Sequence, residues 1–183
     1  MGKRYQALET AHIDFIRRQH IFFVATAAWE GTVNLSPKGL DSLRVLNKNR
    51  IIWLNVTGSG NETSAHVQQN PRMTIMFCAV EDKPLILRAY GQARVIHPKD
   101  SDWSLLYPRF NPLPGARQIF DLDIEMVQTS CGMGVPLFDF VGQREELIEW
   151  GEHKGEDGIK EYWRDKNQAS LDGLPTNIVK KGL

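Results

Sequence analysis

The chain has 183 residues, of which 42% are hydrophobic, 24% charged and 9% aromatic. This composition is typical of a soluble globular protein and excludes the disordered and fibrous classes. A chain of this length is expected to form one compact domain with a sizeable core. Lysine plus arginine and aspartate plus glutamate number 22 each, so the formal net charge is zero. Because a protein that binds nucleic acid through bulk charge is basic, general nucleic-acid binding is disfavoured.

Charge is unevenly distributed along the chain. Residues 139–166 carry nine acidic and five basic side chains, whereas residues 71–120 carry seven basic and four acidic ones. The acidic stretch therefore predicts a solvated helical face, and the basic stretch could contact a small anion.

The sequence shows no secretion, membrane or metal-binding pattern. The first five residues, MGKRY, lack the apolar run of a secretion signal, and the longest apolar stretch, 21–29, is less than half of the roughly 20 residues that cross a bilayer. Two cysteines, Cys78 and Cys131, make no disulfide framework, and the five histidines have no ligand spacing. We expect a soluble, cytoplasmic protein without a membrane segment or a metal.

Six runs rich in β-branched and aromatic residues, bounded by turn residues, predict strands. They span 21–27, 32–36, 50–56, 73–80, 85–96 and 119–128. Helices are expected over 8–16, from a capping box formed by Ser59 and Glu62 to about residue 69, and over 99–106, 143–150 and 158–166.

The short spacing of these strands leaves no room for repeated helical crossovers, which argues against a doubly wound parallel sheet. We expect a mainly β fold with peripheral helices, in which a six-stranded antiparallel sheet closes into a barrel and so removes its exposed edges. The prediction is a single domain over 1–183, with a barrel core at about 18–130 and a helical C-terminal extension at about 140–183.

Residues 57–63 (TGSGNET) leave a predicted strand and open a predicted helix, which is the setting of a phosphate cradle. Glycines let the backbone approach a ligand closely, the N–H groups at a helix start attract an anion, and Asn61 and Thr63 offer polar side chains. The alternative is an ordinary capped helix, which explains every residue and avoids the repulsion between Glu62 and a phosphate.

A second polar segment precedes this one. Asn34, Ser36 and Lys38 alternate in or just after a strand, so all three are expected on one face. An amide, a hydroxyl and a cation together suit a phosphate or a heterocycle with polar edges. A solvated strand edge is the alternative.

A hydrolase is disfavoured. Ser59 lies on a strand-to-helix turn, but its surroundings are not Gly-x-Ser-x-Gly and the parallel β/α units of that fold are absent from the pattern, so a helix N-cap is the better interpretation. Cys131 is more typical of a small packed residue than of a nucleophile, and Cys78 is expected in the core.

The ordered set of these motifs resembles the pyridoxamine 5′-phosphate oxidase-related FMN-binding split barrels. The resemblance covers roughly residues 18–97, and residues 130–136 and 172–175 are similar to the C-terminal part of one subgroup. The motifs that carry it are 34–39 (NLSPKG), a strand with Trp53, 57–66 (TGSGNETSAH), 70–71 (NP), 76–78 (MFC) and 87–93 (LRAYGQA).

This resemblance implies a split β-barrel homodimer that holds two FMN molecules at the subunit interface. Trp103, Trp150 and Trp163 are expected to offer apolar surface to the partner. By position, the cofactor-binding residues are Asn34, Ser36 and Lys38 on one strand, Thr57 near the flavin, Asn61 and Thr63 at the phosphate, and Arg88 and Tyr90 on a facing strand.

The chain departs from the family pattern at the helix opening, where Glu62 and Thr63 replace an Arg-Lys pair, and near the C-terminus, where the arginine- and histidine-containing substrate residues are not evident. The resemblance therefore implies an FMN-dependent oxidoreductase with an unassigned substrate and electron donor, and not a true pyridoxamine phosphate oxidase. A non-catalytic flavin- or haem-binding or sensing protein is the alternative, and a deazaflavin could replace FMN. His66, one helical turn from the loop, is a candidate base, although a packing role fits it better.

Overall fold

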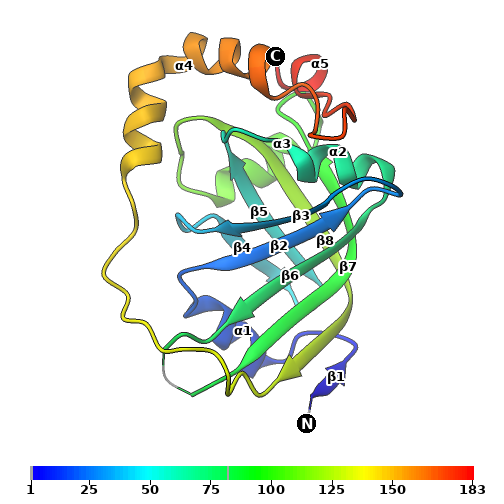
Figure 1. Cartoon of the computed structure of the whole chain (residues 1–183), viewed down its shortest axis with the longest axis vertical. Helices are drawn as coiled ribbons and strands as arrows, with labels where there is room; N and C mark the ends of the chain where they lie inside the picture. The colour runs from blue at the N-terminus through cyan, green and yellow to red at the C-terminus, as the bar shows by residue number, and fades with distance from the viewer. Residues whose placement is uncertain (1, 82) are drawn as a thin grey trace.

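The computed structural model describes residues 2–81 and 83–183 (Figure 1). One antiparallel sheet forms its centre, with the strand order β3-β2-β6-β7-β8-β5-β4 and with β1 paired to β8. The strands are β1 (Lys3–Tyr5), β2 (Phe22–Ala27), β3 (Val33–Lys38), β4 (Leu43–Asn47), β5 (Arg50–Val56), β6 (Arg72–Cys78), β7 (Ile86–Ile96) and β8 (Ala116–Ser130). The helices are α1 (Thr10–Arg17), α2 (Glu62–Gln69), α3 (Trp103–Leu106), α4 (Glu146–Lys166) and α5 (Ile178–Gly182), with a 3₁₀ turn at Tyr107–Arg109.

The mainly β class with peripheral helices is confirmed, but the described sheet has eight strands and not six. The two extra strands are weak in the sequence: β1 has three residues without alternation, and β4 is interrupted by a register shift between Val45 and Asn47. β3 also runs two residues further than expected, through Pro37 to Lys38. Proline is tolerated there because β3 is an edge strand and needs no second ladder of hydrogen bonds.

The helices differ from the expectation in detail. Helix α2 begins at Glu62 with Asn61 as its N-cap and without a side-chain capping bond, so the proposed capping box of Ser59 and Glu62 is wrong. The two helices expected at the acidic end are the two halves of α4, which meet at Gly155 with φ +64° and ψ 174°. α3 is shorter than expected, and α5 was not expected.

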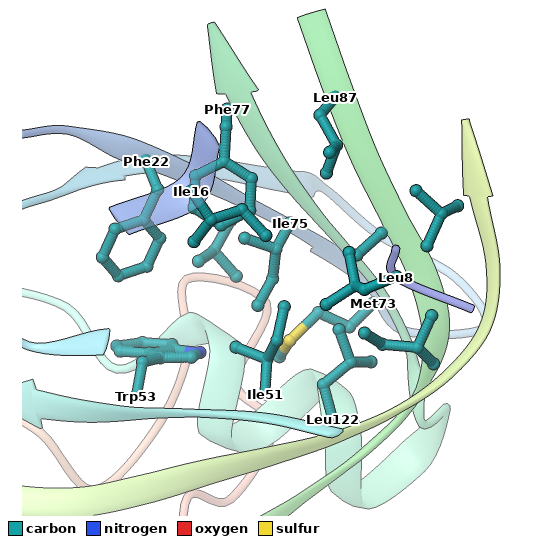
Figure 2. Packing of buried hydrophobic residues seen from close by; sticks show 14 of the residues in the cluster. Leu8, Ile16, Phe22, Ile51, Trp53, Met73, Ile75, Phe77, Leu87 and Leu122 are labelled. Carbon is teal, nitrogen blue, oxygen red and sulfur yellow. The ribbon is translucent and has the colours of Figure 1, made fainter. Parts of the chain in front are cut away.

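The core fills the inside of the curled sheet. Figure 2 shows Phe22, Phe77 and Trp53 directed toward one another from β2, β6 and β5. Trp53 stacks on Phe120 with 4.6 Å between ring centroids and meets Phe22 edge-on at 6.2 Å. Cys78 lies at the border of this core, as expected. Trp53 also connects the core to the end of β3, because Nζ of Lys38 lies over its ring.

The C-terminal part of the chain covers one end of the barrel. A segment of residues 131–145 (the arm) runs along the outside of the barrel from β8 to α4, which lies with α5 above α2 and α3 (Figure 1). Ile159, Trp163 and Ile178 form a buried cluster of their own in this region. No helix in the described part of the chain is long and apolar enough to cross a membrane.

Candidate functional site

A polar cavity of about 440 Å³ lies where the end of β3, the end of β5, the start of α2 and the start of β8 meet. Both polar segments singled out from the sequence reach it. The lining includes Asn34, Ser36, Lys38, Ser42, Asn55, the loop 57–61, Thr63 and Arg117.

Strand β3 presents its polar face to this cavity and its apolar face to the outside. Asn34, Ser36 and Lys38 are half-buried and line the cavity, whereas Val33 and Leu35 are 75% and 63% exposed. This arrangement is the reverse of the usual one, in which the apolar face of a strand packs inward. The polar face of β3 therefore serves the cavity, and its apolar face is left without cover in the protomer.

Lys38 places a cation in this cavity. Its Nζ lies 5.4 Å from the ring centroid of Trp53, within the range of a cation–π contact. Burial, followed by repulsion from Arg117, lowers the pKa of Lys38 from 10.5 to about 8. The protein thus keeps the ammonium in a place where its charge is poorly solvated.

Arg117 places a second cation beside the first. Its side chain, 3% exposed, donates from Nη1 to Oδ1 of Asn167 (2.7 Å) and from Nη2 to the carbonyl oxygen of Gly60 (2.7 Å). Its Nε has no hydrogen-bond partner among the described residues. Burial lowers the pKa of Arg117 to about 9.

Neither cation has a carboxylate within 4 Å in the described part of the chain. An unpaired buried charge costs several kcal/mol, so such a pair is expected to persist where a ligand supplies the opposite charge. Oγ of Ser36 and Oδ1 of Asn61 are likewise buried without partners among the described residues. Two cations, a hydroxyl group and an amide oxygen that can accept a hydrogen bond therefore suit an anion that carries hydroxyl groups.

Glu62, which the sequence suggested would repel a phosphate, is engaged elsewhere. Its carboxylate Oε2 accepts a hydrogen bond from the backbone N–H of Leu171 at 2.9 Å. One carboxylate oxygen of Glu62 is therefore hydrogen-bonded to the C-terminal segment, although the residue still lines the cavity.

Six of the eight sequence-predicted cofactor residues come together here: Asn34, Ser36, Lys38, Thr57, Asn61 and Thr63. Asn34 donates from Nδ2 to Oγ1 of Thr63 (3.1 Å), which joins β3 to α2. The hydroxyl of Thr57 donates to the carbonyl of Gly115 (2.7 Å) and accepts from Nε1 of Trp163 (2.8 Å), so it fixes the loop.

Arg88 and Tyr90 do not line the cavity. They lie on the face of β7 opposite to the buried Leu87 and Ala89, where Arg88 contacts Ser130 and the hydroxyl of Tyr90 contacts Gln128. Their assignment to the cofactor stays a prediction. Sequence reasoning also missed Arg117, because the last strand was expected to start only at residue 119.

Of the remaining candidates, Ser59 lines the polar cavity, and His66 and Cys131 do not. His66 is fully buried against β2, with Nδ1 3.2 Å from Oγ1 of Thr26, and belongs to the packing rather than to the cavity. Ser59 is exposed and precedes the N-cap, so its interpretation as the N-cap is wrong. Cys131 is exposed rather than packed. No cluster of three metal-ligating side chains occurs in the described ranges.

A larger, mostly apolar cavity of about 1300 Å³ adjoins the polar one. Both cavities are lined by residues 37–40, which include the last two residues of β3, and by Leu147. The larger cavity is bounded by Phe15 of α1, by the β6–β7 connection and by Phe138 and Phe140 of the arm. A cavity with two cations and an apolar cavity thus lie side by side.

The sheet is an open antiparallel barrel, and its two-cation cavity lies between β3, β5, α2 and β8. This architecture is that of the split barrels. The family model described as pyridoxamine 5′-phosphate oxidase matches residues 8–131. The pyridoxamine 5′-phosphate oxidase family protein ustO of Aspergillus flavus is 36% identical over 191 aligned positions, which cover 93% of this chain and 76% of that protein. The chain belongs to the pyridoxamine 5′-phosphate oxidase family.

Solved structures agree on the fold. A putative pyridoxamine 5′-phosphate oxidase from Lactobacillus delbrueckii is similar with a TM-score of 0.53 and 20% identity, over 67% of this chain and 94% of that one. HupZ of Group A Streptococcus gives a TM-score of 0.51 and 20% identity, over 65% of this chain and 91% of that one.

The electrostatics of the cavity predict a measurable coupling between its two cations. Replacing Arg117 with methionine should raise the pKa of Lys38 above its value of about 8, because the repulsion disappears while the burial remains. NMR titration of the Lys38 side chain measures this pKa. Arg109→Met, at an exposed arginine, is the matched control and should leave it unchanged. An unaltered pKa in the Arg117 variant would contradict the proximity of the two charges.

Proposed function

We propose that the protein is an FMN-binding oxidoreductase of the pyridoxamine 5′-phosphate oxidase family that acts in the cytoplasm. The observation that carries this proposal is the pair of cations, half-buried Lys38 and buried Arg117, without a carboxylate partner among the described residues, beside a large apolar cavity. FMN combines a dianionic phosphate, a chain of hydroxyl groups and an apolar ring system. These three parts match the cations, the unpartnered atoms of Ser36 and Asn61, and the apolar compartment.

Each residue would have a defined task with FMN. Lys38 and Arg117 would compensate the phosphate through charge-assisted hydrogen bonds. The hydroxyl of Ser36 and the amide oxygen of Asn61 would contact the polyol chain, since both are buried without partners among the described residues. The apolar side chains of the larger cavity would exclude water from the ring. The bound flavin supplies electron or hydride transfer, and the protein supplies binding and orientation.

A small-molecule substrate or electron donor would enter the larger cavity. Pyridoxamine phosphate oxidation itself is disfavoured, because Glu62 and Thr63 stand where the resemblance places an Arg-Lys pair.

The second candidate is a flavin- or haem-binding protein that stores or senses its ligand without turnover. The lining of the polar cavity fits the flavin form of this alternative better than the haem form, because its described residues include no histidine or cysteine to ligate iron. Addition of NAD(P)H to the flavin-loaded protein, followed by an external acceptor, separates the two. Repeated reduction and re-oxidation supports the oxidoreductase, and a flavin that cannot be reduced supports the alternative.

Purification of the protein tests the flavin itself. We expect a yellow protein with flavin absorbance, or tight FMN binding to the purified chain, because the cavity holds two uncompensated cations. Absorbance spectroscopy and calorimetric titration with FMN measure this. A colourless protein that takes up no FMN would refute the proposal.

We further propose a homodimer. Trp163 is buried, and Trp103 and Trp150 contact tyrosines of their own chain, so the expectation that all three face a partner is wrong for Trp163 and unsupported for the others. The apolar surface lies instead on the outer face of β3 and on the arm. Its exposed members are Val33, Leu35, Met133, Leu137, Phe138, Phe140 and Val141.

Leu35 offers a direct test of this dimer. Light scattering of the wild type at micromolar concentration should give twice the mass of the chain, and Leu35→Glu should shift the equilibrium toward the monomer, because it places a charge in an apolar contact. Leu105→Glu, at an exposed leucine outside the β3 and arm surface, is the matched control. A wild type that is monomeric while saturated with FMN contradicts the dimer.

Lys38 tests the phosphate contact. Lys38→Ala should weaken FMN binding about ten- to a hundredfold, because it removes a charge-assisted hydrogen bond to the phosphate. Riboflavin, which lacks the phosphate, should bind the variant and the wild type about equally, and the melting temperature of the free protein should barely change or rise slightly because an unfavourably buried charge is removed. Fluorescence quenching measures both affinities. Unchanged FMN affinity together with a destabilised free protein would show that Lys38 is structural.

A further inference from the structure

The C-terminal segment 163–172 contacts two elements that line the polar cavity, the loop 57–61 and the start of α2, and also the residue just before β3, although it lies beyond residues 8–131 that the family model matches. Nε1 of Trp163 donates to Thr57 in the loop, and the backbone N–H of Leu171 donates to Glu62 at the start of α2. Asp172 accepts hydrogen bonds from the backbone N–H and the hydroxyl of Thr32, just before β3 (2.8 and 2.7 Å). The cavity is therefore built jointly by the barrel and this segment.

Asn167 is the central contact of this segment. It is fully buried, and its Oδ1 accepts from Nη1 of Arg117 at 2.7 Å. Its Nδ2 donates to the carbonyl oxygen of Gly58 at 3.0 Å. Arg117 in turn donates to the carbonyl of Gly60 at 2.7 Å. One amide side chain thus fixes both the guanidinium and the loop through which an anion would be bound.

That Asn167 is a neutral amide and not a carboxylate matters as much as its position beside Arg117. A carboxylate in the same place would pair with the guanidinium and cancel its charge, whereas the amide oxygen of Asn167 orients Arg117 and leaves its charge available. Nε of Arg117, which Asn167 does not contact, has no partner among the described residues. Burial with an uncharged acceptor therefore keeps this cation ready for an anionic ligand.

We propose that Asn167 is a positioning residue that gives the site its preference for a phosphorylated ligand over the same ligand without its phosphate. The proposal rests on the proposed function for its flavin ligand, but the anion contact can be measured without a flavin. The ligand class is a phosphate monoester, with inorganic phosphate or pyrophosphate as its simplest mimic, bound by Arg117 and Lys38. Asn167 sets the direction of the Arg117 guanidinium and leaves its charge uncompensated.

The test compares Asn167→Asp with Asp172→Asn. Asn167→Asp should lower FMN affinity at least about tenfold and riboflavin affinity much less, because the new carboxylate offsets the charge of Arg117 that only the phosphate would use, whereas the lost donor to Gly58 affects both ligands. It should also raise the pKa of Lys38 above about 8, since a new carboxylate offsets the repulsion from Arg117. Asp172→Asn is the matched control, because it weakens a contact of the same segment with Thr32 that does not involve Arg117. It should change neither the ratio of FMN affinity to riboflavin affinity nor the pKa of Lys38.

Calorimetry with inorganic pyrophosphate separates this proposal from the flavin function. Pyrophosphate binding to the wild type that is lost in Asn167→Asp supports the proposal even if FMN does not bind. An FMN-to-riboflavin ratio that is unchanged in Asn167→Asp, or that falls equally in Asp172→Asn, overturns it while FMN binding stands. A wild type that binds neither FMN nor pyrophosphate overturns both.

A measurement on the wild type covers the case in which Asn167→Asp fails to fold. Pyrophosphate should slow amide hydrogen exchange in residues 163–171 more than in residues 152–158 of α4, because the former contact the cavity through hydrogen bonds and none of the latter lines it. Equal protection of the two segments, or protection of neither, contradicts the proposal.

Discussion

The polar cavity depends above all on one interaction: the guanidinium of Arg117 is buried without a carboxylate partner among the described residues. Moving a guanidinium out of water costs several kcal/mol unless its donors find acceptors, and here the acceptors are the neutral oxygens of Gly60 and Asn167. The loop ahead of α2 and the segment after α4 must both be in place to supply them. The site, the loop and the C-terminal segment are thus tied to one side chain on β8.

The second constraint is the orientation of β3. Because side chains alternate across a strand, directing Asn34, Ser36 and Lys38 toward the cavity necessarily directs Val33 and Leu35 outward. The polar face that lines the cavity therefore leaves an apolar outer face. The proposed ligand binding and the proposed assembly are linked through the register of this single edge strand, and a shift by one residue would exchange the two faces.

Much of the site was accessible to sequence reasoning because it is local. The alternation over 34–38 and the glycine-containing loop 57–63 are short-range patterns, and both reach the cavity. Arg117 was missed because the prolines and the glycine before it indicate a loop, whereas β8 already begins at residue 116. Asn167 left no signal at all, since its meaning depends on a contact with a residue fifty positions earlier.

The same reasoning explains the strands that were missed and found. Long runs of β-branched and aromatic residues predict strands such as β5 and β7 because their side chains pack on both faces or alternate between core and outside. β1 and β4 are too short or too irregular for that signal, and they are held by pairing with β8 and β5. Tertiary pairing, and not local preference, makes them strands.

The dependence of the cavity on Trp163 and Asn167 has a consequence for how the protein matures. Because the N-terminus of a chain leaves the ribosome first, all the described strands of the sheet emerge before these two residues do. During that interval the barrel can pair its strands while the guanidinium of Arg117 still lacks Asn167, and the loop 57–61 still lacks its hydrogen bonds to the later segment. Binding of the proposed cofactor would therefore come late in biosynthesis, after the C-terminal segment has docked on the sheet.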